Sequence, residues 1–124
     1  MKKNIAMLDS VPVKSNFDEL SNNFLRIGDA EKSQWLPYYY AAYVTALQGV
    51  MERDLNKKDQ IADYASEILK KAENILNKEN SEIEVIKSMI ATAHMTVDPQ
   101  SRYMTYGQEI SEAIAKSKQL DSTN

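Results

Sequence analysis

The sequence predicts an all-α protein built from stacked antiparallel helical hairpins, with five main helices and a possible short N-terminal one. Three observations support this fold class. The chain has only three glycines and three prolines, and the helix-favouring residues Ala, Leu, Glu and Lys dominate it. Apolar residues recur at helical spacing in five segments. No segment alternates apolar and polar residues over a useful length, so we expect no strands.

Composition limits the functions that the chain can have. Its 124 residues predict one domain, or one compact run of repeats. The absence of cysteine excludes disulfides, thiolate metal sites and thiol catalysis. A net charge of −3 gives no basic surface, so nucleic acid is not an expected partner. No apolar run approaches the roughly 20 residues that span a bilayer, so we expect no membrane span.

We divide the chain into an N-terminal segment, residues 1–14, and a helical-repeat domain, residues 15–124. The segment begins with a methionine and two lysines, but its apolar stretch is too short for the core of a signal peptide. It is expected to be a short helix, within 2–9, or to be disordered. As the chain stands we expect a cytoplasmic protein, or a periplasmic one if an N-terminal signal was removed.

The first two main helices are predicted over 15–28 and about 34–54. Ser15 is the expected N-cap of the first helix, and Gly28 ends it. Pro37 is tolerated because it falls in the first turn of the second helix. The second helix is expected to turn one face to the core (Leu36, Tyr40, Tyr43, Leu47, Val50) and another to solvent (Thr45, Gln48, Glu52).

The third and fourth helices follow short polar segments. A loop over 56–59 is expected to end in Asp59, the N-cap of the third helix. Ser81 and Glu84 form a capping box that opens the fourth helix, over 81–97. The inward stripes of these two helices are Ile61, Ala65, Ile68, Leu69, Ala72, Ile75 and Leu76, and then Ile83, Ile86, Ile90, Ala93 and Val97.

Pro99 ends the fourth helix, and Asp98 is the expected N-cap of the fifth. Its apolar stripe is Tyr103, Tyr106, Ile110, Ile114, Ser117 and Leu120. Because no later helix in the sequence covers this stripe, the chain is a candidate homo-oligomer that pairs through its C-terminal helix.

One spacing of apolar and small residues recurs three times at intervals of 45 residues: Leu20, Phe24, Ile27; Ala65, Leu69, Ala72; Ile110, Ile114, Ser117. It resembles the second helix of a tetratricopeptide repeat, where small residues let helices approach and a large one fills the groove between them. The period is longer than the about 34 residues of that repeat. The terminal proline of the repeat is replaced by Asn77 or Ser122. We infer that three equivalent helices dock side by side.

Four runs also resemble an uncharacterised bacterial family of such repeat proteins: Glu31–Tyr40, Ser81–Ala93, Val97–Arg102 and Lys118–Asn124. The resemblance covers about residues 15–124. It implies a divergent tetratricopeptide-like α-solenoid, commonly in proteins made with a signal peptide. It implies no assigned activity and transfers no catalytic residue.

His94 is the only histidine, and it precedes Asp98 by four residues on one helix face. That spacing suits a metal or an acid–base pair, but two ligands are too few for a tight site. We therefore favour a hydrogen-bonded histidine beside a capping aspartate. Glu79, Glu82 and Glu84 are interpreted as solvated groups that complement a helix dipole. No catalytic, cofactor or metal site is expected.

Trp35 and four tyrosines form the most suggestive cluster. Successive residues turn by about 100° on a helix, so these rings cannot share one face. Tyr40 and Tyr43 are expected in the core. Tyr38 and Tyr39 are equally compatible with core packing and with contact to a ligand.

Two further features have mainly structural interpretations. Arg102 could bind a carboxylate of a peptide, although a tie to Asp98 within its own turn is favoured. The methionines, among them Met51, Met89, Met95 and Met104, are expected to be mostly gap-fillers. No phosphate-binding loop, nucleophile elbow or zinc-protease motif occurs.

The leading functional hypothesis is a non-catalytic protein- or peptide-binding scaffold whose concave surface is lined by helices 34–54 and 81–97. The alternatives are a structural, self-associating helical protein and a small metal-assisted hydrolase that uses His94 and Asp98. The expected partner-binding residues are Tyr38, Tyr39, Thr45, Gln48, Lys87, Thr92, His94 and Arg102.

Overall fold

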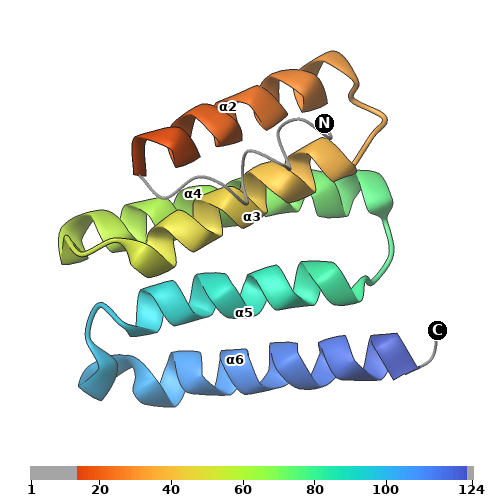
Figure 1. The fold of residues 1–124 in the computed structure, drawn as a ribbon. Coiled ribbons are helices and arrows are strands. Elements are labelled where there is room, and N and C mark those ends of the chain that lie inside the picture. The colour runs from red at the N-terminus through yellow and green to blue at the C-terminus, as the bar shows by residue number, and fades with distance from the viewer. Residues whose placement is uncertain (1–13, 123–124) are drawn as a thin grey trace.

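The computed structural model describes residues 14–122, and this part of the chain is entirely helical (Figure 1). Five helices follow one another: α2 (Lys14–Ala30), α3 (Leu36–Met51), α4 (Leu55–Leu76), α5 (Ser81–Met95) and α6 (Pro99–Ser122). Within these residues there is no strand, so the all-α fold class with five main helices is confirmed. The short helix predicted within 2–9 lies outside the described residues.

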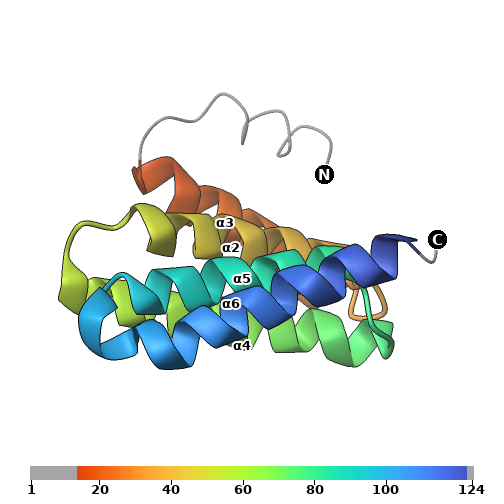
Figure 2. The same ribbon diagram turned by 90° about the horizontal axis from the view of Figure 1, so that it is seen from below.

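Each helix packs against the next one in the chain, and α3 also packs against α5. Figure 1 shows the chain reversing at each short loop, so that neighbouring helices are antiparallel. The view in Figure 2 separates α3 from α4, which overlap in Figure 1. No helix of the described part is long and apolar enough to cross a membrane.

The three helices that carry the repeated spacing, α2, α4 and α6, are not direct neighbours. Among residues 14–122, the substantial contacts join consecutive helices and the pair α3 and α5. The prediction that the three helices dock side by side is therefore wrong. The repeated residues also differ in burial, since Phe24 and Ala65 are fully buried, whereas Ile114 is 42% exposed.

The core lies around α3, which is covered by α2, α4 and α5. Phe24 and Leu20 of α2 are fully buried against it. A Cβ atom added at Gly28 would lie 2.9 Å from the Tyr38 ring, so glycine is what allows α2 and α3 to meet there. The expected inward stripes of α4 and α5 are confirmed by the burial of most of their members. The buried members are Ala65, Ile68, Leu69 and Ala72 in α4, and Ile83, Ile86, Ile90 and Ala93 in α5.

Several predicted helix ends differ from the observed ones. Lys14 already lies in α2, so Ser15 is inside the helix and is not its N-cap. The segment 56–59 is not a loop, because α4 begins at Leu55 and the side chain of Asp54 accepts a 3.0 Å hydrogen bond from the Asn56 backbone N–H. An aspartate stands at both positions 54 and 59, and spacing alone does not choose which of them is the cap.

Asn80, and not Ser81, caps α5. Its side-chain oxygen accepts hydrogen bonds from the backbone N–H groups of Glu82 and Ile83, at 2.8 and 3.2 Å. The asparagine thus satisfies two of the free N–H groups that every helix start leaves. At the next boundary α6 begins at Pro99 as expected, and the carbonyl of Asp98 accepts a hydrogen bond from the Arg102 N–H.

The predicted solvent face of α3 is buried. Thr45 is 2% exposed and its hydroxyl lies 2.9 Å from that of Ser21, while Gln48 is 7% exposed and donates to Asp18. Glu52 is buried as well. The reason is tertiary: α2 covers the face that looks polar in the sequence, and its own polar groups supply the hydrogen bonds.

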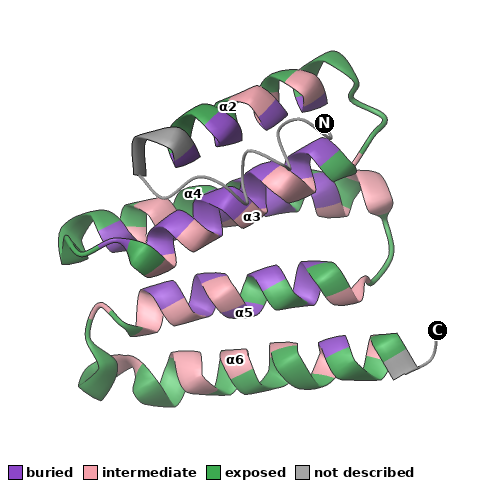
Figure 3. Ribbon diagram, viewed as in Figure 1, coloured by how far each residue is buried: buried purple, intermediate pink, exposed green. Residues whose placement is uncertain are grey.

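The described part of α6 is packed on one side only (Figure 3). Tyr103, Met104 and Ile114 are 65%, 79% and 42% exposed, which contradicts the gap-filling role expected for Met104. Met51 is also exposed, at 55%. Pairing of α6 with a second copy of the chain stays a prediction.

Candidate functional site

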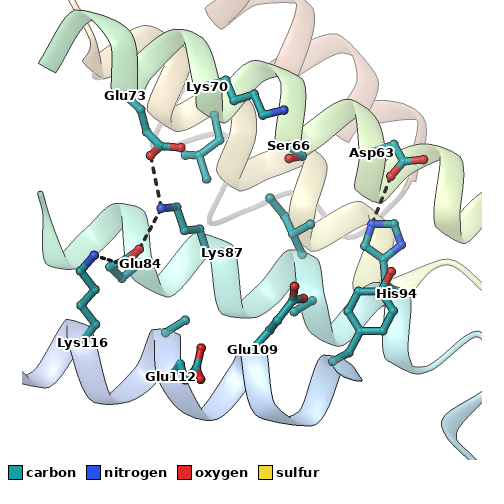
Figure 4. A pocket seen from close by; sticks show the side chains of 15 residues that line it. Asp63, Ser66, Lys70, Glu73, Glu84, Lys87, His94, Glu109, Glu112 and Lys116 are labelled. Atoms are coloured by element: carbon teal, nitrogen blue, oxygen red, sulfur yellow. Dashed lines mark ion pairs between the residues drawn. The ribbon is translucent and has the colours of Figure 1, made fainter. Parts of the chain in front are cut away.

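A groove runs along α5, with α4 and α6 as its walls (Figure 4). It exists because α4 and α6 both pack on α5 but make no substantial contact with each other within the described residues. The cavity holds about 640 Å³, which is a usual size for a small-molecule site. Its lining is Asp63, Ser66, Leu69, Lys70 and Glu73 from α4, Glu84, Lys87, Ile90, Ala91 and His94 from α5, and Tyr106, Glu109, Glu112, Ala113 and Lys116 from α6.

His94 marks one end of this groove, where it is held from three sides. Its Nδ1 lies 2.7 Å from Oδ1 of Asp59, and its Nε2 lies 3.2 Å from Oδ1 of Asp63. Its ring stacks on Tyr106, with centroids 5.3 Å apart and an interplanar angle of 20°. The side chain is only 13% exposed, so its orientation is fixed by the protein.

Arg102 fixes Asp59 in turn. Its two terminal nitrogens donate to the two carboxylate oxygens of Asp59, at 2.7 and 3.0 Å, and one of them also donates to the His94 carbonyl at 2.9 Å. Such forked pairing is the strongest geometry available to arginine. The hydrogen bonds from Arg102 lower the pKa of Asp59, against an opposing effect of burial, and His94 adds to the lowering. One carboxylate therefore joins α4, α5 and α6.

We expect the Asp59→Asn variant to be less stable than the parent chain at neutral pH and equally stable in acid. Because the folded-state pKa of Asp59 is lowered, its contribution is present above the unfolded-state pKa of about 3.9 and is lost as the pH falls through the folded value. Urea unfolding of both chains between pH 7 and pH 3 measures this. A stability difference that stays constant over the range would contradict the assignment.

The opposite end of the groove carries alternating charges. Glu84, 6% exposed, lies between two lysines: Lys87 Nζ is 3.3 Å from its Oε2, and Lys116 Nζ is 3.5 Å from its Oε1. Lys87 also pairs with Glu73 at 3.2 Å, and Lys116 pairs with Glu79 at 2.6 Å, which raises the pKa of Lys116. Within the described chain, Oε2 of Glu84 forms the ion pair with Lys87 but accepts no hydrogen bond. Glu84 is therefore not the solvated cap that was predicted.

No family model matches the chain, and no curated protein matches it either. The solved structure of the HusA haemophore from Porphyromonas gingivalis is similar, with a TM-score of 0.85 and 34% sequence identity. The similarity covers 98% of this chain and 59% of the haemophore, so the chain spans little more than half of that protein. The neighbour is a binding protein rather than an enzyme, and the tetratricopeptide resemblance is not confirmed by a family model.

Two of the predicted partner-binding residues, Lys87 and His94, line the groove. Arg102 lies behind it, tied to Asp59 and not to the predicted Asp98. The hydroxyl of Thr92 donates to the Ser88 carbonyl and lies outside the groove lining. His94 likewise pairs with Asp59 and Asp63 and not with Asp98.

The other four predicted contact residues lie on α3, away from the groove. Thr45 and Gln48 are buried under α2. Tyr38 is 5% exposed, and its hydroxyl donates a 2.6 Å hydrogen bond to Asp29, which is the main cause of a pKa raised to about 12. Tyr39 is half-buried between Trp35 and other rings, and burial raises its pKa to about 12. Of the two roles left open for Tyr38, core packing is the one that its burial and its bond to Asp29 favour.

The residues of the groove walls were not predicted from the sequence. Tyr106 was assigned to the core stripe of the last helix, and Lys70 and Lys116 were not singled out. A weak signal exists, since Asp63, Ser66, Lys70 and Glu73 follow helical spacing along one side of α4. A polar stripe of this kind also marks an ordinary solvent face. Among the described residues, no group of three or more His, Asp and Glu side chains is placed to hold a metal ion.

Proposed function

We propose that this chain is a non-catalytic carrier that binds a planar tetrapyrrole such as haem in the groove between α4, α5 and α6. The observation that carries the proposal is the similarity to a haemophore over 98% of the chain. The groove adds support, because it is a cavity of about 640 Å³ whose lining combines apolar side chains with lysines, alongside five carboxylates. This function agrees with the expectation of a binding protein but replaces a peptide with a small molecule.

The surface of the groove suits a flat, mostly apolar body. Leu69, Ile90 and Ala91 line the groove and are buried, and the half-buried Ala113 lines it from α6. The small side chains leave space, and the Tyr106 ring offers a face for stacking. Burial of apolar surface contributes about 25 cal/mol per Å², so a porphyrin ring gains most of its binding free energy from such contacts.

The charges of the groove suit a ligand with few carboxylates at one edge. Lys70, Lys87 and Lys116 can accept propionate groups, and Lys87 and Lys116 are each more than 40% exposed, so their heads can exchange partners. The acidic residues of the lining disfavour ligands that are anionic throughout. A nucleotide or polyphosphate is therefore a poor fit.

The test is a titration of the full chain with iron(III) protoporphyrin IX, followed by the Soret absorbance and by quenching of the single tryptophan. We expect saturable one-to-one binding with a micromolar or lower Kd. Ala113→Trp fills the groove and should weaken binding at least tenfold. Ala115→Trp adds the same ring on the exposed side of α6 and should leave the Kd unchanged. Equal behaviour of the two variants would remove the groove from the proposal.

A peptide- or protein-binding scaffold is the second candidate. The observation in its favour is that three large apolar side chains of α6, Tyr103, Met104 and Ile114, are exposed. Binding of this kind would be lost in Met104→Asp and kept in Ala113→Trp.

A carrier that takes up haem from outside the cell would also fit the periplasmic alternative for the location of the protein.

A further inference from the structure

We propose that His94 is a proton-operated latch between α5 and α4 at one end of the groove. When its ring carries both protons, it holds Asp59 and Asp63 of α4 at once. When the ring loses one proton, it releases Asp63. Figure 4 shows the ion pair with Asp63, which crosses from α5 to α4. The latch acts on the fold itself and does not depend on the molecule that the groove binds.

The number of protons on the ring decides how many of its contacts are hydrogen bonds. Nδ1 lies 2.7 Å from Oδ1 of Asp59, and Nε2 lies 3.2 Å from Oδ1 of Asp63. An ionised carboxylate only accepts hydrogen bonds, and a neutral imidazole has a single N–H to donate. Only the doubly protonated ring therefore donates to both aspartates. In the neutral ring, one nitrogen lone pair faces a carboxylate oxygen, and this contact is repulsive.

Asp59 is the partner that stays when the ring is neutral. Arg102 donates to both of its carboxylate oxygens and also to the His94 carbonyl. Arg102 lowers the pKa of Asp59 as well, so this carboxylate remains ionised while the ring changes its charge. Asp59 makes the shorter of the two contacts with the ring. The proton that remains is therefore assigned to Nδ1.

Asp63 is the partner that is released. Its side chain is 74% exposed, compared with 34% for Asp59, so it turns into water at little cost once Nε2 no longer donates. Asp63 and His94 both line the groove, and α4 and α6 make no substantial contact across it within the described residues. Release of Asp63 therefore removes a tie between α4 and α5 at this end and leaves the pair of Asp59 and Arg102 intact.

The remaining surroundings of the ring come from α6 and α3. Tyr106 of α6 stacks on the ring, with centroids 5.3 Å apart, and holds its plane in both charge states. Glu109 lines the groove about one turn further along α6. α3 approaches this part of α5 with Gly49, where an added Cβ would lie 3.6 Å from that of Ala93, and glycine has no side chain to titrate. At Nε2 the ion pair that the described residues supply is the one with Asp63, so the proton on this nitrogen controls it.

NMR of the full chain, labelled with ¹³C and ¹⁵N, reads the latch directly, because His94 is the only histidine. Spectra are recorded from about pH 8 to pH 5, the range in which histidines change charge. The ring should begin with one proton, on Nδ1, and end with a proton on each nitrogen. The carboxyl carbon of Asp63 should shift with the same midpoint as the ring. A neutral ring protonated on Nε2, or an Asp63 signal that does not follow the ring, would overturn the proposal.

Asp63→Asn tests whether the contact stabilises the fold, because asparagine keeps the size of the side chain and removes its charge. Urea unfolding should show the parent chain to be more stable than this variant at about pH 5, and the difference should close by about pH 8. The sign follows because the contact with the charged ring is present in acid and is lost as the pH rises.

Two further variants show whether the effect passes through the ring. Glu67→Gln is the matched control, about one turn further along α4 at an exposed position outside the groove lining, and its stability relative to the parent should not vary over this pH range. In a His94→Gln background, Asp63→Asn should have no pH-dependent effect. A difference between the parent and Asp63→Asn that is the same at both ends of the range would overturn the latch.

Discussion

Replacing Lys58 with methionine is expected to lower the free energy of unfolding by about 3 kcal/mol. Lys58 is 5% exposed, and its ammonium group donates to the carbonyls of Gly49, Val50 and Glu52 at 3.0, 2.8 and 3.0 Å. These carbonyls belong to the end of α3, where no backbone N–H follows to satisfy them. Methionine keeps the apolar stem but leaves three acceptors without their donor.

The matched control for this prediction is Lys57→Met, because Lys57 is the exposed neighbour in the same turn of α4. It should change stability by less than about 0.5 kcal/mol. Chemical denaturation followed by circular dichroism at 222 nm measures both variants. Burial lowers the pKa of Lys58, so the ammonium group is retained at a cost that only the three carbonyls offset. Equal stability of the two variants would show that these carbonyls are satisfied in another way.

Local sequence signals were sufficient for the helices themselves. The stripes of α4 and α5 were predicted because their apolar residues face a single direction, and Pro37 and Pro99 mark helix starts where proline fits. The capping residues were less certain, because Asp54 competes with Asp59 and Asn80 competes with Ser81. Both residue types of each pair are good caps.

Long-range packing was not predictable in the same way. Thr45 and Gln48 look like solvent-facing residues, and only the presence of α2, with Ser21 and Asp18, makes their burial favourable. The same limit applies to the groove, which is assembled from α4, α5 and α6. His94 was expected to pair with Asp98 in its own helix, yet its partners are Asp59 and Asp63, 35 and 31 positions earlier in the chain.

The repeated spacing predicted the helices but not their neighbours. Helices with a small–large–small pattern can pack against any helix that offers a complementary ridge. In α4 the residues Ala65, Leu69 and Ala72 are buried in the core, whereas in α6 the corresponding Ile114 is exposed. A period of 45 residues therefore indicates a similar hairpin length, and it does not fix which helices touch.

Phe24→Ala is expected to have the largest effect on stability, a loss of about 3–5 kcal/mol in the attachment of α2. Phe24 is fully buried, and its ring lies 5.4 Å from that of Tyr40. Alanine removes this contact and leaves a cavity between α2 and α3. Hydrogen exchange measured residue by residue, together with the denaturation midpoint, gives the size of the loss and its location. Met104→Ala, at a position 79% exposed, is the control that should change neither.

The loss in Phe24→Ala is expected in a part of the fold that does not form the groove, so stability and porphyrin binding can be tested separately. Within residues 14–122, the substantial contacts of α2 are made with α3 alone, whereas the groove is built from α4, α5 and α6. Amide protection in Phe24→Ala should therefore fall first in α2, as local opening, and much less in α5. Porphyrin binding should keep its Kd within about twofold, because no lining residue has moved. If protection in α5 fell as far as in α2, the chain would unfold as one unit and the groove would depend on α2 after all.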